Sequence, residues 1–269
     1  MDGVPDVTTS GTSLESVVIL VATVVGLFVG SFLNVVVHRA PLGLSVSTPR
    51  SFCPTCDRQL AWWENVPLLS WTVLRGRCHT CHEPISVRYP LVEASTAAVF
   101  GLVAWAWHGT LPTAGYCVLS ATALAIALIE YGDQRSPLAV GATGTGLGAV
   151  LLVPGFLVVH RGTSLAWALL GLTVGTAVFG MLRARDPDCR DPRSHGRTLL
   201  PLAGLWLGGL GGRPTVAGLA SWVLTSFVCL VVLWVDRRGT SDRRVPAVAV
   251  EPLVSGIVVA LTVSLWVAG

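Results

Sequence analysis

The sequence predicts an all-α polytopic membrane protein of about eight transmembrane helices, with a metal-binding loop between the first two. Three observations lead to this fold class. Of the 269 residues, 52% are hydrophobic and only 12% are charged, which is about half the charged fraction of a soluble domain. Eight apolar stretches follow one another, and most of them are long enough to cross ~30 Å of hydrocarbon. The one long polar stretch contains two pairs of cysteines in the spacing of a metal site.

The chain divides into a tail, a first crossing, a polar loop and a larger membrane domain. Residues 1–13 are polar and lack a basic region, so we expect an external tail and not a cleaved signal peptide. Residues 14–37 are expected to form transmembrane helix 1, residues 38–89 the loop, and residues 90–269 a membrane domain with helices 2 to 8. The apolar stretches of this domain are 90–107, 111–129, 138–159, 165–182, 199–210, 216–235 and 246–268.

The arginines predict how the chain is oriented in the membrane. All 18 basic residues are arginine. With eight crossings, all but Arg161 and Arg213 fall on the same side as the polar loop, which the positive-inside rule places in the cytoplasm, with both termini outside. The stretch 199–210 is short, but without it as a crossing the arginines of 237–244 would change side. Eight crossings are therefore favoured over six or seven with a buried half-helix.

Four cysteines of the loop form two CxxC pairs separated by 21 residues. They are Cys53, Cys56, Cys78 and Cys81. A two-residue spacer lets both sulfurs of a pair face one point, so two pairs close a tetrahedral site. Thiolate-only ligation favours structural zinc, with iron as the alternative, and a reducing cytoplasm argues against two disulfides. His79 and His82 flank the second pair as alternative ligands, although two solvated histidines are the simpler interpretation.

Four motifs surround these cysteines in a fixed order. They are GSFLNVVVHR (30–39), WENVPLLSW (63–71), LRGRC (74–78) and PISVRYPLVE (84–93). In the first, Gly30 and Asn34 share one helix face and are expected either to pack against another helix or to contact substrate or methyl donor. Glu64 is compatible with a solvated surface acid, whereas Glu93 is expected to be paired because it lies near a membrane segment.

This ordered set closely resembles the amino-terminal half of the prepilin leader peptidases, also called type IV prepilin peptidase/N-methyltransferases. The resemblance implies a membrane aspartic peptidase of the GxGD type in the bacterial inner membrane. Such an enzyme cleaves the leader of type IV pilin or type II secretion pseudopilin precursors and methylates the new amino terminus with S-adenosylmethionine. Prepilin precursors and the lipid bilayer are the expected partners, and no nucleic acid is expected. No methyl-donor motif is recognisable, so that cofactor rests on the resemblance.

The sequence departs from the family pattern at the two catalytic aspartates. The family has a pattern like I-D-x-D-x-x-x-L-P-D after the third crossing, and alignment on Pro137 places the aspartate position on Gly132. Counting back from the small-residue helix of the second motif places the other aspartate position on Gly196, or on Arg197 if a one-residue gap is allowed. An aspartic peptidase needs two carboxylates close enough to share a proton. Glu130 and Asp133 are the candidate carboxylates close to the first position.

Three functions follow as hypotheses. The first is a working prepilin peptidase and N-methyltransferase. The second is a catalytically degenerate member that lacks the aspartate dyad and binds prepilins as a scaffold or retains only methyltransferase activity. The third is a small transporter, which is disfavoured because the apolar stretches hold acidic residues only near their ends and no arginine.

Overall fold

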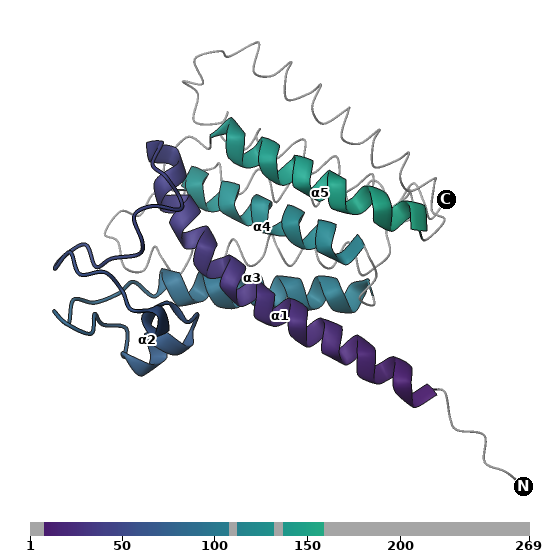
Figure 1. Cartoon of the computed structure of the whole chain (residues 1–269), viewed down its shortest axis with the longest axis horizontal. Helices are drawn as coiled ribbons and strands as arrows, with labels where there is room; N and C mark the ends of the chain where they lie inside the picture. The colour runs from purple at the N-terminus through teal and green to yellow at the C-terminus, as the bar shows by residue number, and fades with distance from the viewer. Residues whose placement is uncertain (1–7, 108–111, 132–136, 159–269) are drawn as a thin grey trace, which may run out of the picture.

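The computed structural model describes residues 8–107, 112–131 and 137–158. Its elements are α1 (Thr8–Arg39), η1 (Ala40–Leu42), η2 (Trp62–Asn65), α2 (Leu69–Val73), α3 (Arg88–Ala106), α4 (Pro112–Tyr131) and α5 (Leu138–Val158), where η denotes a 3-10 helix. The helices α3, α4 and α5 form a layer, and the long α1 crosses it (Figure 1). The described part of the chain is therefore mostly helical, as predicted.

Two stretches of these helices are long and apolar enough to span a membrane. They are Leu14–Leu42 and Pro112–Ile129. The expected crossings 90–107 and 138–159 are not among these spans, and the four apolar stretches expected after residue 159 lie outside the described residues, so the total of eight crossings remains a prediction.

The exposed face of α1 is strongly apolar. Leu20 is 63% exposed and Phe28 is 57% exposed, whereas the side chains of α4 are mostly buried among α1, α3 and α5. An apolar face of this length is unfavourable in water, and lipid is the solvent that fits it. Helix α1 therefore forms the outer edge of the described bundle.

Helix α1 packs closely against α3 through two glycines that are one helical turn apart. A Cβ atom added to Gly26 would lie 2.7 Å from the Cα of Ala97, and one added to Gly30 would lie 2.7 Å from the Cα of Glu93. Small residues spaced four apart allow membrane helices to approach this closely. The polar neighbours of Gly30 single it out in the sequence, but its pairing with Gly26 was not predicted.

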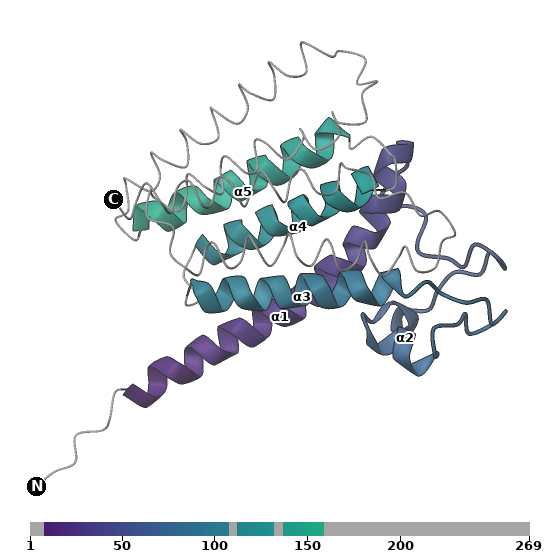
Figure 2. The same ribbon diagram turned by 180° about the vertical axis from the view of Figure 1, so that it is seen from behind.

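The loop between α1 and α3 folds beside the start of α3, at one end of the bundle (Figures 1 and 2). Trp71 belongs to α2 in this loop, and its indole N–H donates to the carbonyl oxygen of Ile85 at 3.2 Å. Gly76 has a φ of 65°, and a Cβ atom there would lie 2.8 Å from the Trp71 ring. The backbone conformation and the ring together require glycine at this turn.

Candidate metal centre

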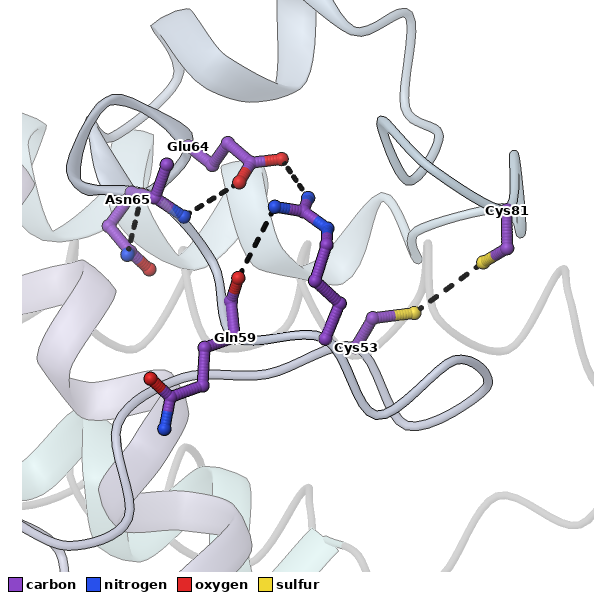
Figure 3. A network of polar contacts seen from close by, with 7 residues as sticks. Cys53, Gln59, Glu64, Asn65 and Cys81 are labelled. Atoms are coloured by element: carbon purple, nitrogen blue, oxygen red, sulfur yellow. Dashed lines mark hydrogen bonds and ion pairs between the residues drawn. The ribbon is translucent and has the colours of Figure 1, made fainter.

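The four cysteine sulfurs converge on one point from two separate turns. All four lie within 4.8 Å of one another, and the Sγ atoms of Cys53 and Cys81 are 3.7 Å apart (Figure 3). Tetrahedral zinc–thiolate bonds of ~2.3 Å place sulfurs about 3.8 Å apart, so the cluster has the size of such a site. No other group of metal-ligating side chains occurs within the described ranges. The predicted metal-ligating residues are therefore brought together.

The first cysteine pair sits in a tight turn of the backbone. The N–H of Cys53 donates to the carbonyl oxygen of Arg58 at 3.0 Å, and the N–H of Asp57 donates back to the carbonyl oxygen of Cys53 at 2.9 Å. An antiparallel bridge between Phe52 and Gln59 closes the turn. Asp57 has a φ of 52°, a conformation that aspartate tolerates better than most residues.

The second pair repeats this geometry. The N–H of Cys78 donates to the carbonyl oxygen of Glu83 at 2.8 Å, and the N–H of His82 donates to the carbonyl oxygen of Cys78 at 3.1 Å. His82 has a φ of 59°, and it follows the second cysteine of its pair as Asp57 does in the first. The two turns thus present their sulfurs to a common centre from equivalent backbones.

Neither histidine belongs to the sulfur cluster. The His79 ring packs edge-on against Trp63, with ring centroids 5.5 Å apart and an interplanar angle of 88°. This contact joins the second cysteine turn to η2. The alternative of histidine ligation is therefore not supported.

Backbone N–H groups favour thiolates at the first cysteine of each pair. Hydrogen bonds from the N–H groups of Cys81 and Thr80 lower the pKa of Cys78 to about 6. Those from Cys56 and Thr55 lower the pKa of Cys53. Because metal ligation requires thiolates, the turns prepare these two sulfurs to bind a cation.

The pKa of Cys81 shifts in the opposite direction. A backbone hydrogen bond from Glu83 acts to lower the pKa of Cys81, but burial and contacts with the other cysteines outweigh it and raise the pKa to about 12. A bound cation would release the proton that the clustered sulfurs retain.

A buried carboxylate stabilises the loop next to the sulfurs. Glu64 Oε1 accepts a 2.5 Å hydrogen bond from Nη2 of Arg58, and Glu64 Oε2 accepts one of 2.7 Å from the N–H of Ala61 (Figure 3). Its side chain is 2% exposed, so the interpretation of Glu64 as a solvated surface acid is wrong. The hydrogen bond from Arg58 is the main cause that lowers the pKa of Glu64 below its usual value of 4.5.

We expect Glu64→Gln to destabilise the loop at neutral pH by about 1–3 kcal/mol, the effect of impairing hydrogen bonds to a buried charged group. The folded-state pKa is depressed, so the contribution of Glu64 is complete above pH 4.5 and is lost as the pH falls through the folded-state pKa. The difference in melting temperature between wild type and variant should therefore narrow in acid. A difference independent of pH would contradict this role of the charge.

Polar contacts also fix the loop to the helices. Glu93, in the second turn of α3, accepts a 2.8 Å hydrogen bond at Oε2 from the N–H of Leu68 and a further one from Ser31. Asn34 Nδ2 donates to the carbonyl oxygen of Tyr89 at 3.3 Å. The motif that begins at Gly30 thus packs α1 against α3, and Glu93 is held by hydrogen bonds rather than by an ion pair within the described residues.

The side chains of the catalytic candidates are outside the described residues. Glu130 is in the last turn of α4, and its side chain is outside the described residues, as are Asp133, Gly132 and Gly196. The assignment of Glu130 and Asp133 therefore remains a prediction.

Comparison with known proteins gives a family match for the first part of the chain and longer alignments with individual relatives. The family model described as "Bacterial Peptidase A24 N-terminal domain" matches residues 24–107, which contain the second half of α1, the cysteine loop and all of α3. A "Type 4 prepilin-like proteins leader peptide-processing enzyme" of Escherichia coli O78:H11 is 35% identical over 245 residues, which cover 82% of this chain and 87% of the relative. The chain belongs to the prepilin leader peptidase family.

Other family members show the same similarity over different lengths. The Neisseria gonorrhoeae prepilin leader peptidase/N-methyltransferase is 30% identical, with 80% of this chain and 82% of the relative aligned. The Myxococcus xanthus relative is 42% identical over 159 residues, which are 59% of this chain and 46% of the relative. The chain thus spans about half the length of some of the relatives that it matches with the highest identity. No solved structure matches this chain.

Proposed function

We propose that this member of the prepilin leader peptidase family cleaves the leader of type IV pilin or pseudopilin precursors and methylates the new amino terminus. The observation that carries the proposal is the intact four-cysteine module, held against α1 and α3 within the residues 24–107 that match the family's amino-terminal domain. The long alignments to processing enzymes extend the similarity into the second half of the chain. They favour a working enzyme over a scaffold.

We propose zinc as the metal and assign it a structural role. The donor set consists of four sulfurs in a cluster of tetrahedral size, which suits zinc. Cys53, Cys56, Cys78 and Cys81 would hold the ion and leave no position for water or substrate. Zinc would therefore fold the loop and take no part in bond cleavage.

For the cleavage step, Glu130 and Asp133 are the proposed pair of carboxylates. One carboxylate takes a proton from the attacking water, and the other donates a proton to the leaving amide nitrogen as the peptide C–N bond breaks. Glu130 belongs to the last turn of α4, and Asp133 follows it three residues later in sequence. S-adenosylmethionine would supply the methyl group for the second reaction.

We further propose a multi-pass protein of the bacterial inner membrane with eight crossings and the cysteine loop in the cytoplasm. The arginines of the sequence support this orientation. The leader of a prepilin would then meet the enzyme on the side where the loop lies.

Co-expression with a prepilin, in cells without their own prepilin peptidase, tests the proposed function. Immunoblotting should show conversion of the precursor to the mature size. Glu130→Gln and Asp133→Asn should each slow cleavage by about 10²-fold or more, because general acid–base catalysis contributes 10²–10⁴-fold. Asp57→Asn is the matched control, since this exposed loop residue tolerates asparagine at positive φ.

The outcomes separate two claims. If the wild-type chain leaves the prepilin at full length, the proposed function is wrong. If the wild type cleaves and both carboxylate variants cleave as fast, the function stands and the assignment of Glu130 and Asp133 is wrong.

A further inference from the structure

The short helix α2 presents an apolar face that the rest of the described structure leaves uncovered. Leu69 is 59% exposed and Val73 is 66% exposed. They are four residues apart and therefore lie on the same side of the helix. Unlike the exposed leucines of α1, these residues belong to a loop with a polar sequence and a metal site, so a membrane crossing does not explain them.

The contacts of Leu68, the residue before α2, set the depth of α2 relative to the membrane. The N–H of Leu68 donates to Glu93 Oε2 at 2.8 Å, and the backbone of Glu93 lies against Gly30. Gly30 is inside the apolar span Leu14–Leu42. Counted from Leu14, a crossing of ~20 residues ends about three residues after Gly30, and the expected helix 14–37 ends seven residues after it. Leu68 thus lies near the boundary between hydrocarbon and headgroups.

Both views of the molecule agree with this level. Helix α2 lies next to the start of α3, at the end of the bundle where the loop is located (Figures 1 and 2). Its exposed apolar face is thus located where the bilayer surface would surround the helices.

The residues around α2 have the chemistry of a membrane interface. Trp62, on the adjoining η2, is 82% exposed, and tryptophan is enriched at the headgroup level of membrane proteins. Arg75 and Arg77 follow α2 directly and are exposed. Arginines next to an apolar surface favour contact with anionic lipid headgroups.

We propose that α2 is an interfacial anchor, in which Leu69 and Val73 insert at the headgroup–acyl boundary of an anionic bilayer and the adjacent arginines pair with lipid phosphates. The loop with the metal site is then docked on the membrane surface along one side. The bond between Leu68 and Glu93 holds α2 at the required level. This inference does not depend on the peptidase or methyltransferase reaction.

Photocrosslinking of the full chain tests the anchor. The photoreactive amino acid p-benzoylphenylalanine replaces Val73, and the protein is placed in nanodiscs of equal parts phosphatidylglycerol and phosphatidylcholine. After irradiation, mass spectrometry should find lipid adducts on the peptide that contains position 73. The same replacement at Glu83, an exposed residue of the second cysteine turn, is the matched control and should give at least tenfold less lipid adduct.

Other results would overturn the proposal. A crosslink from position 73 to residues 159–269 would show that the chain covers its own face, and a crosslink to a second copy would indicate an oligomer interface. Equal lipid labelling at both positions, or no adduct at position 73, would also contradict it. Retained metal content shows that each variant is folded.

A second measurement applies if the replacement of Val73 disrupts the loop. Brominated lipids should quench the tryptophan emission of the wild type more than that of Trp62→Phe. If the two proteins are quenched equally, Trp62 does not reach the bilayer and the proposal fails.

Discussion

Replacing Gly30 by valine is expected to destabilise the bundle by about 3 kcal/mol, the upper end of the range for overpacking. The new Cβ atom would lie 2.7 Å from the Cα of Glu93 and 3.0 Å from the carbonyl oxygen of Val92. Both are backbone atoms of a helix, which cannot move aside as a flexible side chain would. Thermal unfolding of the protein in detergent measures the effect as a fall in melting temperature.

Gly146→Val in α5 is the matched control for this substitution. A Cβ atom added to Gly146 meets no atom within 4 Å, so the same chemical change has space there. We expect a melting temperature close to that of the wild type. Equal falls for the two variants would show that valine lowers helix stability generally and that close packing of α1 on α3 is unimportant.

The second large effect is expected from the cysteine pairs. Cys78→Ser combined with Cys81→Ser should abolish metal binding and unfold the loop, because structural zinc sites contribute apparent free energies of about 10–16 kcal/mol at pH 7. Elemental analysis of the purified protein should find one zinc per wild-type chain and almost none in the double variant. Hydrogen exchange should increase throughout the loop.

Two further variants show whether the loss is specific. Cys117→Ala removes a buried thiol of α4 and should leave the metal content unchanged, as should His79→Ala. Metal retained by the double cysteine variant would contradict the four-sulfur site. If His79→Ala stays folded but loses its metal, His79 would have to be assigned as a ligand.

The features that sequence predicts well here depend on local chemistry. The spacing of Cys53 to Cys56 and of Cys78 to Cys81 dictates two metal-binding turns whatever surrounds them. The apolar stretches likewise predict the helices, and α4 ends two residues after the expected limit of its stretch. These patterns are readable because each is complete within a short segment.

The features that sequence missed depend on contacts between distant segments. Glu64 is buried because the loop folds back on Arg58, and no periodic pattern in the sequence predicts this contact. The bond between Leu68 and Glu93 joins residues 25 positions apart. The exposed face of α2 was also not predicted, because its two apolar residues are unremarkable until the level of the helix is known.

This chain differs from the family pattern at the positions of the catalytic aspartates. The pattern places its aspartates on Gly132 and Gly196, so resemblance alone does not say which carboxylates act. Glu130 and Asp133 are proposed because a pair is required and these two acids are nearby.

The fate of a purified prepilin tests the central claim most directly. The full chain, purified in detergent, is incubated with a purified prepilin and S-adenosylmethionine, and mass spectrometry follows both parts of the substrate. The proposed function predicts release of the leader and a mature chain that carries one methyl group on its new amino terminus. A precursor that stays intact, while the N. gonorrhoeae relative processes it under the same conditions, would contradict that function.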